Sequence, residues 1–73
     1  MANINIEKAF GQRVKKIRKS LGLSQEQLSF KSGLHRNYIC DVERGKRNVS
    51  LKAIEQLANG LEIEIEELFR KEN

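Results

Sequence analysis

A stripe of apolar residues at helical spacing restricts the fold of this chain more than any other feature of its sequence. Successive members of the stripe are separated by four, four, three and four residues, and Gly22 follows the last of them. This spacing places all the members on one face of an α-helix, which a glycine commonly ends. The pattern predicts an amphipathic first helix whose buried face consists of Ile6, Phe10, Val14, Ile17 and Leu21.

Two short helices are expected within residues 25–43. Ser24 and Gln27 have the spacing of a capping box, which marks the start of the first of these helices. Residues 32–34 have a central glycine and predict a tight turn, after which the next helix continues to about Glu43. Two short helices joined by a turn of this length form a helix-turn-helix unit.

The C-terminal part of the chain is expected to add two more helices. Ser50 is a suitable N-cap for a fourth helix, whose period stops near Gly60 and whose buried apolar face is expected to consist of Leu51, Ile54, Leu57, Ala58 and Leu61. Residues 64–71 have a weaker helical pattern. The alternating apolar residues at 61–65 would also suit a strand, but the glutamates between them favour helix and no second strand is available for pairing. The sequence therefore predicts an all-α fold, a compact five-helix domain spanning residues 1–73.

The length of the chain and its reactive residues limit the ways in which it can be stabilised. A chain of 73 residues provides one modest core, and domains of this size commonly depend on a disulfide, a metal or a partner subunit. Cys40 is the single cysteine and His35 the single histidine, which excludes a disulfide or a structural zinc site within one chain. We therefore expect tight helix packing, dimerisation or both, with no metal and no cofactor.

Neither a targeting segment nor a catalytic motif is recognisable. The N-terminus lacks the basic and apolar regions of a signal peptide, and no apolar run approaches the roughly 20 residues that span a bilayer. A cytoplasmic protein without membrane contact is expected, and a reduced cysteine suits that compartment. Paired catalytic carboxylates and a phosphate-binding glycine loop are also missing, so an enzyme is the least expected class.

The basic side chains are concentrated in one part of the chain. Residues 1–47 contain 11 Lys and Arg residues against four Asp and Glu residues, whereas residues 48–73 contain three against six. A strongly basic segment indicates a polyanionic partner, with nucleic acid first among the candidates. A solvated basic face on the first helix is the alternative that charge alone leaves open.

Several short motifs lie in and around the predicted helix-turn-helix. They are Arg18, Gly22-Leu23-Ser24-Gln25-Glu26-Gln27-Leu28, Ser32-Gly33-Leu34, Tyr38-Ile39 and Val42-Glu43-Arg44-Gly45-Lys46. This set resembles the Cro/phage-repressor helix-turn-helix family, and the resemblance covers residues 8–69. It implies a domain of the lambda-repressor-like DNA-binding type. Within the family, residues 34–39 and 43–51 resemble controller proteins of bacterial restriction–modification systems. Ser29 departs from the family's usual alanine, and its hydroxyl is expected to bond to a carbonyl of its own helix.

The resemblance implies how the third helix would contact DNA. A recognition helix presents its N-terminal residues to base edges in the major groove. Arginine can pair with guanine, asparagine with adenine and aspartate with cytosine, so the residue types independently suit this task. For Asp41, repulsion by phosphates argues against base contact, and orientation of Arg36 is an alternative role. The residues expected at base edges are Arg36, Asn37 and Asp41, with His35 beside them.

Other residues are expected to contact the DNA backbone or to hold the domain together. Basic and polar side chains and a helix N-terminus bind phosphates through charge and hydrogen bonds. The resemblance also implies a buried ion pair between Arg18 and Glu43, which would tie the first helix to the end of the third. Backbone contacts are expected from Gln25, Tyr38, Arg44, Lys46, Arg47 and Ser50.

The C-terminal region, residues 57–71, has more apolar residues than one small core needs. We therefore expect a twofold homodimer. Such a dimer would place two recognition helices in successive major grooves of a palindromic operator, with half-site centres roughly 10 bp apart. The expected interface residues are Leu61, Ile63, Ile65, Leu68 and Phe69. RNA polymerase is a candidate further partner, through the acidic residues Glu62, Glu64, Glu66 and Glu67.

These observations together predict a sequence-specific, double-stranded DNA-binding transcriptional regulator, and specifically a restriction–modification controller that acts on its own promoter. A phage or plasmid repressor and an antitoxin are alternatives within DNA binding. A protein-interaction module that does not bind DNA is the alternative from another class. That alternative requires an acidic or apolar face on the third helix, and Arg36 and Asn37 argue against it.

Overall fold

The computed structural model describes residues 5–70 of the chain. These residues form four α-helices and one short 3-10 helix, namely α1 (Ile6–Ser20), α2 (Gln25–Ser32), α3 (Arg36–Glu43), α4 (Leu51–Leu61) and η1 (Ile65–Phe69). The described residues contain no strand, so the all-α prediction is confirmed and the strand alternative at 61–65 is wrong. None of these helices is long and apolar enough to cross a membrane.

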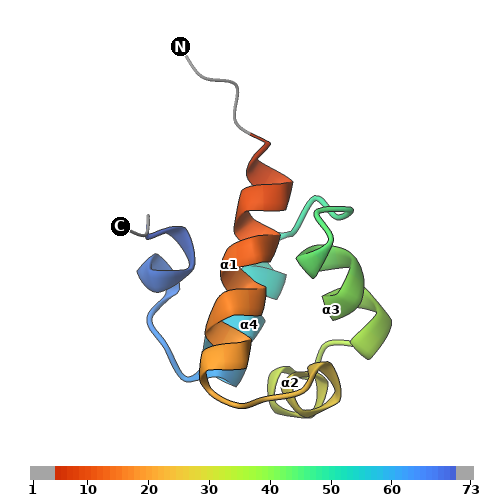
Figure 1. Cartoon of the computed structure of the whole chain (residues 1–73), viewed down its shortest axis with the longest axis vertical. Coiled ribbons are helices and arrows are strands. Elements are labelled where there is room, and N and C mark those ends of the chain that lie inside the picture. Colours follow the sequence, from red (N-terminus) through yellow and green to blue (C-terminus); the bar gives the residue numbers. More distant parts are fainter. Residues whose placement is uncertain (1–4, 71–73) are drawn as a thin grey trace.

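α1 runs through the middle of the molecule, with the other elements arranged around it (Figure 1). α3 packs against one side of α1 and η1 against the other, while α4 lies behind it. α2 packs on α4 and on α3, and α3 packs on α1. The two longer helices, α1 and α4, therefore support the helix-turn-helix on its core side. Every element contributes to one core, which contains Phe10, Val14, Leu28, Ile39, Val42, Leu57, Leu61 and Leu68.

The predicted apolar stripes are buried at their centres and exposed at their ends. Val14 in α1 and Leu57 in α4 are fully buried, as the spacing predicts. Ile6, Leu21 and Leu51 were expected on the same buried faces but are 55%, 50% and 86% exposed. These three residues lie at the first or last turn of a helix, where fewer neighbouring elements cover the helix surface.

The starts of α2 and α4 follow from their capping residues. Ser24 Oγ accepts a hydrogen bond from the Gln27 N–H at 3.0 Å, and the Ser24 N–H donates to Gln27 Oε1 at 2.8 Å. This reciprocal pair is the predicted capping box. Ser50 Oγ accepts from the Ala53 N–H at 3.1 Å and caps α4, also as predicted.

Gly60 lies near the end of α4, whose predicted apolar face extends one residue further, to Leu61. The glycine lies inside the helix, and a Cβ atom at this position would be 2.8 Å from Ser32 Cβ in α2. Glycine at this position therefore allows α2 and α4 to approach each other closely. α4 continues to Leu61, and the left-handed residue that ends it is Glu62, with φ of 58°.

Serine hydroxyls fix the turn between α2 and α3. Gly33 has a left-handed φ of 78°, as the tight turn requires. The Ser29 hydroxyl donates to the Leu34 carbonyl oxygen, and Ser32 Oγ accepts from the Leu34 N–H at 3.2 Å. Ser29 thus bonds to the turn and not to a carbonyl of its own helix, which corrects the expectation for this residue.

The C-terminal segment forms a 3-10 helix in place of the expected α-helix over residues 64–71. No side chain caps its N-terminus, and it spans only five residues. Leu68 is buried in the core, and Arg13 Nε donates to the Glu67 carbonyl oxygen at 2.8 Å, so the segment is fixed against α1. The predicted end of this helix at Lys71 lies outside the described residues.

Candidate nucleic-acid interface

α3 has one face in the core and one polar face exposed to solvent. Ile39 and Val42 are fully buried and anchor the helix. Arg36 and Asn37, in the first turn, are exposed. Within residues 5–70, their side chains form no hydrogen bond or ion pair. The first turn of α3 therefore presents a guanidinium and an amide that are available to another molecule.

His35 caps α3, a role that the sequence patterns did not indicate. Its Nδ1 atom accepts a hydrogen bond from the Asn37 N–H at 3.0 Å. Because Nδ1 is the acceptor, the neutral ring carries its proton on Nε2. Histidine is not one of the common N-cap residues, so its presence before the helix gives little warning of this bond. The Nε2–H group can donate a hydrogen bond, and the His35 side chain that carries it is exposed. His35 directly precedes Arg36 in the chain.

Asp41, Arg47 and Tyr38 form a cluster at the edge of the exposed face of α3. Asp41 does not contact Arg36, the alternative considered for it; its Oδ2 atom lies 3.4 Å from Arg47 Nε. The Arg47 Cζ atom lies 5.2 Å from the centroid of the Tyr38 ring, within the range of a cation–π interaction. Helical spacing does not reveal this cluster, because Arg47 belongs to the loop between α3 and α4.

Arg18 and Glu43 form the buried ion pair that the resemblance implies. Arg18 Nε donates to Glu43 Oε2 at 2.6 Å, and Arg18 Nη2 donates to Glu43 Oε1 at 3.0 Å. The Gln25 side chain, expected at the DNA backbone, also donates to Glu43 Oε1 at 3.0 Å. The second hydrogen of the Gln25 amide is left as a donor to a phosphate oxygen.

Cationic side chains follow α3 along the loop to α4. Arg44 and Lys46 are exposed, and neither side chain has a partner in the part of the chain that the structure describes. At the end of the loop, Ser50 accepts its capping bond through Oγ and so keeps its hydroxyl hydrogen for another acceptor. Its N-terminal position on α4 adds the free N–H groups that bind anions. Four of the six residues expected at phosphates, Arg44, Lys46, Arg47 and Ser50, thus lie in one segment, whereas Gln25 and Tyr38 belong to α2 and α3.

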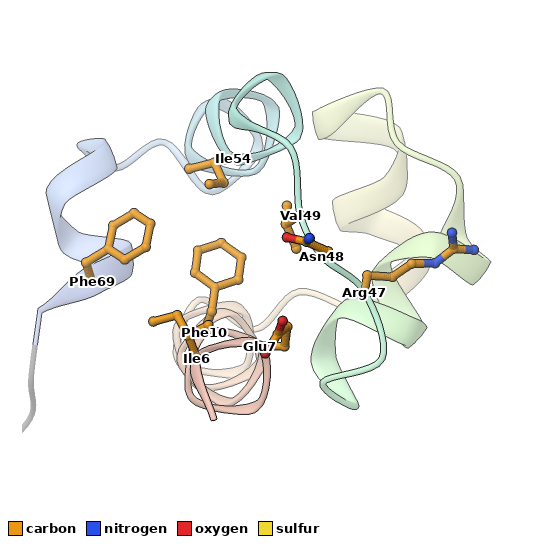
Figure 2. Close-up of a pocket in the computed structure, with 8 residues that line it drawn as sticks. All are labelled: Ile6, Glu7, Phe10, Arg47, Asn48, Val49, Ile54 and Phe69. Atoms are coloured by element: carbon orange, nitrogen blue, oxygen red, sulfur yellow. The ribbon is translucent and has the colours of Figure 1, made fainter. Parts of the chain in front are cut away.

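A separate apolar patch lies over α4, η1 and the start of α1. Leu51, Ile54, Ile65 and Phe69 line one shallow hollow. An adjoining hollow of about 80 Å³ lies where Ile6, Phe10, Ile54 and Phe69 face one another (Figure 2). The Phe10 and Phe69 ring centroids are 5.4 Å apart. We refer below to Ile6, Leu51, Ile54, Ile65 and Phe69 as the apolar patch.

The apolar patch only partly coincides with the interface expected from the sequence. Leu61 and Leu68 are 2% and 1% exposed, so they belong to the core of this chain and offer no surface to a partner. Ile63 is half-buried against the core. Ile65 and Phe69 are 48% and 53% exposed and remain candidates. The patch adds Ile6, Leu51 and Ile54, which were expected on buried faces because helical periodicity does not show where covering elements end.

A tight turn between two short helices, with an exposed polar face on the second, is the arrangement of a DNA-binding helix-turn-helix. The family comparison agrees with this geometry, because the helix-turn-helix family matches residues 14–68. The chain belongs to the Cro/C1-type helix-turn-helix family of transcriptional regulators, which are not enzymes.

The similar proteins include restriction–modification controllers, as the sequence resemblance implies. Control protein C.BamHI of Bacillus amyloliquefaciens is 49% identical over 66 residues, which cover 89% of this chain and 82% of C.BamHI. The crystal structure of the controller C.AhdI from Aeromonas hydrophila has a TM-score of 0.87 and 53% identity, over 90% of this chain and all of that chain. An immunity repressor of Bacillus phage phi105 is 42% identical over 62 residues, which cover 85% of this chain and 43% of the repressor.

Proposed function

We propose that this chain is a restriction–modification controller that binds a palindromic operator as a homodimer and regulates its own promoter. The exposed first turn of α3 is the observation that carries the proposal. Arg36 and Asn37 are exposed there while Ile39 and Val42 hold the opposite face in the core. A helix fixed in this way can enter the major groove with its N-terminal side chains against base edges.

The surrounding polar groups support a role in DNA backbone contact. Arg44, Lys46 and the N-terminus of α4 at Ser50 lie in one segment after α3. Gln25 begins α2, the helix that crosses the backbone in this motif. Such contacts fix the register of the protein on DNA without reading its sequence. In this proposal, Arg36, Asn37 and the Nε2–H of His35 face the bases.

The apolar patch supports the homodimer. Leu51 is 86% exposed, an unusual position for a leucine that borders a hollow lined by three further apolar residues. Exposed apolar surface of this kind marks an interaction site. A twofold contact through the same patch on two copies would be self-complementary, as closed symmetry requires. Two copies joined in this way present two recognition helices to one palindrome, with half-site centres roughly 10 bp apart.

Two sets of observations favour the controller over its alternatives. The controllers C.AhdI and C.BamHI share 53% and 49% identity with this chain and the phage repressor 42%, while another controller, C.SmaI, shares 39%. The exposed residues of the first turn of α3 are basic and amide side chains, which argues against an interaction module that does not bind DNA.

The acidic residues near the C-terminus are the surface we propose for RNA polymerase. Glu62 is paired with Lys31 at 2.7 Å, and this hydrogen bond and charge lower the pKa of the Glu62 carboxyl group. The Glu66 Oε2 atom lies 3.7 Å from Arg70 Nη2. Glu64 remains exposed at the start of η1. If this surface recruits polymerase, the double substitution Glu66→Lys and Glu67→Lys should reduce activated transcription in vitro while leaving DNA binding intact.

Selection from a pool of random duplex DNA tests the proposed function. The selection is run with the wild type and with Arg36→Ala at one fixed salt concentration, because phosphate contacts make affinity depend on salt. We expect the wild type to enrich a palindrome. Arg36→Ala should relax the preference at one position in each half-site and weaken binding to the selected duplex about a hundredfold, because the dimer loses two bidentate base contacts at about tenfold each.

Other results of this selection would identify a different function. Enrichment of a single, non-repeated site would retain sequence recognition and exclude the palindromic dimer. Equal, salt-sensitive binding of all duplexes would indicate a general polyanion binder, and the proposal would be rejected. Gln12→Ala, which changes an exposed residue of α1 outside both the apolar patch and the helix-turn-helix, is the control variant and should select the same sequence as the wild type.

A further inference from the structure

The loop between α3 and α4 holds one arginine in a defined position, in contrast to its neighbours. Arg44 and Lys46 extend from this region without a side-chain partner among residues 5–70. Arg47 instead contacts two side chains of α3, the Asp41 carboxylate through Nε and the Tyr38 ring, over which its Cζ atom lies. A long side chain on a loop otherwise samples many rotamers, and fixing it costs conformational entropy.

The donors of Arg47 are divided between the protein and the solvent. A guanidinium carries five N–H donors in a planar fork, one on Nε and two on each terminal nitrogen. Asp41 Oδ2 accepts from Nε, which leaves the Nη1 and Nη2 donors without a partner in the described structure. Those two nitrogens form the edge that binds phosphate or guanine in a bidentate manner. The side chain is 50% exposed, so this edge is accessible.

We infer that Asp41 is a positioning residue, which holds the Arg47 guanidinium over Tyr38 and presents its Nη1 and Nη2 donors to DNA. Asp41 then makes no base contact of its own, in contrast to the role expected from the sequence. The inference rests on the proposed function, because it assigns a residue to the recognition of the operator. Pairing with Arg47 also offsets the repulsion between this carboxylate and the DNA phosphates.

Fold stability does not account for the contact between Asp41 and Arg47. Their side chains are 35% and 50% exposed, and an ion pair so exposed to water contributes little to folding. The main chain of Asp41 makes a separate bond, in which its carbonyl oxygen accepts from the Lys46 N–H at 2.9 Å. Substitution of the Asp41 side chain therefore leaves the end of α3 and the fold intact.

The first test measures the position of Arg47 without DNA. Nitrogen-15 relaxation of arginine Nε–H groups reports how rigidly each guanidinium is held. In the wild type, the Nε–H of Arg47 should be more ordered than that of Arg44. Asp41→Ala should lower the order of Arg47 to that of Arg44 and leave Arg44 unchanged. Equal order of Arg47 in the wild type and Asp41→Ala would overturn the inference.

The second test is a double-mutant cycle on the duplex selected by the wild type, with mixed-sequence duplex DNA as competitor. Asp41→Ala should weaken binding to the selected duplex about a hundredfold, because the dimer loses the oriented Arg47 contact in both half-sites at about tenfold each. The same substitution should have no effect in an Arg47→Ala background, since nothing remains to be positioned. In an Arg44→Ala background, the matched control, Asp41→Ala should keep its full effect.

The outcomes of the cycle separate the inference from the proposed function. An effect of Asp41→Ala that persists without Arg47 would mean that Asp41 contacts a base itself, and the inference would be wrong. Tighter binding of every duplex in all backgrounds would mean that Asp41 acts only through repulsion of phosphates, which would also overturn the inference. If the wild type selects no duplex, the proposed function fails and the inference fails with it, whatever the relaxation of Arg47 shows.

Discussion

At the scale of single residues, the Glu43 carboxylate connects three helices beneath the exposed face of α3. It accepts hydrogen bonds from Arg18 of α1 and from Gln25 of α2. The third nitrogen of the Arg18 guanidinium, Nη1, donates to the Leu23 carbonyl oxygen at 2.7 Å. In the part of the chain that the structure describes, no buried side-chain nitrogen or oxygen lacks a partner. The network therefore fixes the end of α3 without leaving an uncompensated charge.

Removal of one member of this network should be strongly destabilising. Glu43→Ala leaves the Arg18 guanidinium buried without its counter-charge, which should lower the free energy of unfolding by about 3 kcal/mol. Urea denaturation measures this loss. Glu55→Ala is the matched control, because Glu55 forms an exposed ion pair with Lys52 at 3.0 Å and should contribute less than about 0.5 kcal/mol. Equal losses in the two variants would show that burial does not govern the strength of these pairs.

At the scale of elements, α1 and α3 meet at Gly11 more closely than any other residue would allow. A Cβ atom on Gly11 would lie 2.0 Å from the carbonyl oxygen of Val42 and 3.0 Å from that of Glu43. Both obstacles are backbone atoms, so a side-chain rotation cannot relieve the overlap. Glycine at this position places α1 directly behind the last turn of the recognition helix.

Gly11→Ala should therefore destabilise the domain although alanine is the better helix former. Glycine to alanine in an exposed helix interior gains about 1 kcal/mol, but here the displaced backbone should cost more, for a net loss of about 2 kcal/mol. Thermal denaturation followed by circular dichroism measures the change. Gln12→Ala, at the exposed neighbouring position, should stay within about 0.5 kcal/mol of the wild type. A stabilised Gly11→Ala protein would contradict the close approach of the two helices.

The elements themselves were predictable from local chemistry, and the contacts between them were not. Ser24 and Ser50 start helices through side-chain bonds to neighbours in the sequence, so a short motif is sufficient to locate them. The close approach at Gly60 and the exposure of Leu51 were not predicted, because the surroundings of both residues come from other elements. A period along one helix does not reveal that Ser32 of α2 lies against Gly60, or that nothing covers Leu51.

In the candidate site, too, features set by local sequence were predictable and side-chain contacts were not. The exposure of Arg36 and Asn37 follows from their place at the start of α3, and the structure agrees. The capping bond of His35 and the ion pair of Asp41 depend on side-chain orientation, which residue types and spacing do not specify. The segment that carries the site is therefore predictable from the sequence, whereas the ion pair between Asp41 and Arg47 of the loop is not.

At the scale of the whole molecule, the apolar patch and the exposed face of α3 use different elements. The patch lies on α4, η1 and the start of α1, whereas the exposed side chains of the helix-turn-helix belong to α2, α3 and the loop that follows. η1 and α3 are on opposite sides of α1 (Figure 1). A second copy bound at the patch would therefore leave the face of α3 free for DNA.

Leu51→Glu tests the patch as the dimer interface. Each copy would have to bury an unpaired carboxylate, so the dimer dissociation constant should rise about a hundredfold or more. Because Leu51 is 86% exposed, the monomer fold should be retained. Sedimentation velocity over a series of protein concentrations, with circular dichroism as a check of folding, measures both properties.

Phe30→Glu is the control for this experiment. Phe30 is 91% exposed on α2 and lies outside the patch. The substitution therefore introduces the same charge as Leu51→Glu in place of a similarly exposed apolar residue. We expect this variant to dimerise as the wild type does. Loss of the dimer in Phe30→Glu with retention in Leu51→Glu would transfer the interface to α2, and a wild type that stays monomeric would exclude the homodimer.

The side chains in the first turn of α3 have a consequence for how a regulator of this kind can change. Arg36 and Asn37 take no part in the core or in the buried network of Glu43. If they contact bases as proposed, their replacement alters which base pairs fit without disturbing the contacts that keep the chain folded. Under this proposal, recognition can be recoded, in evolution or in the laboratory, through one helical turn and with no compensating change in the protein interior.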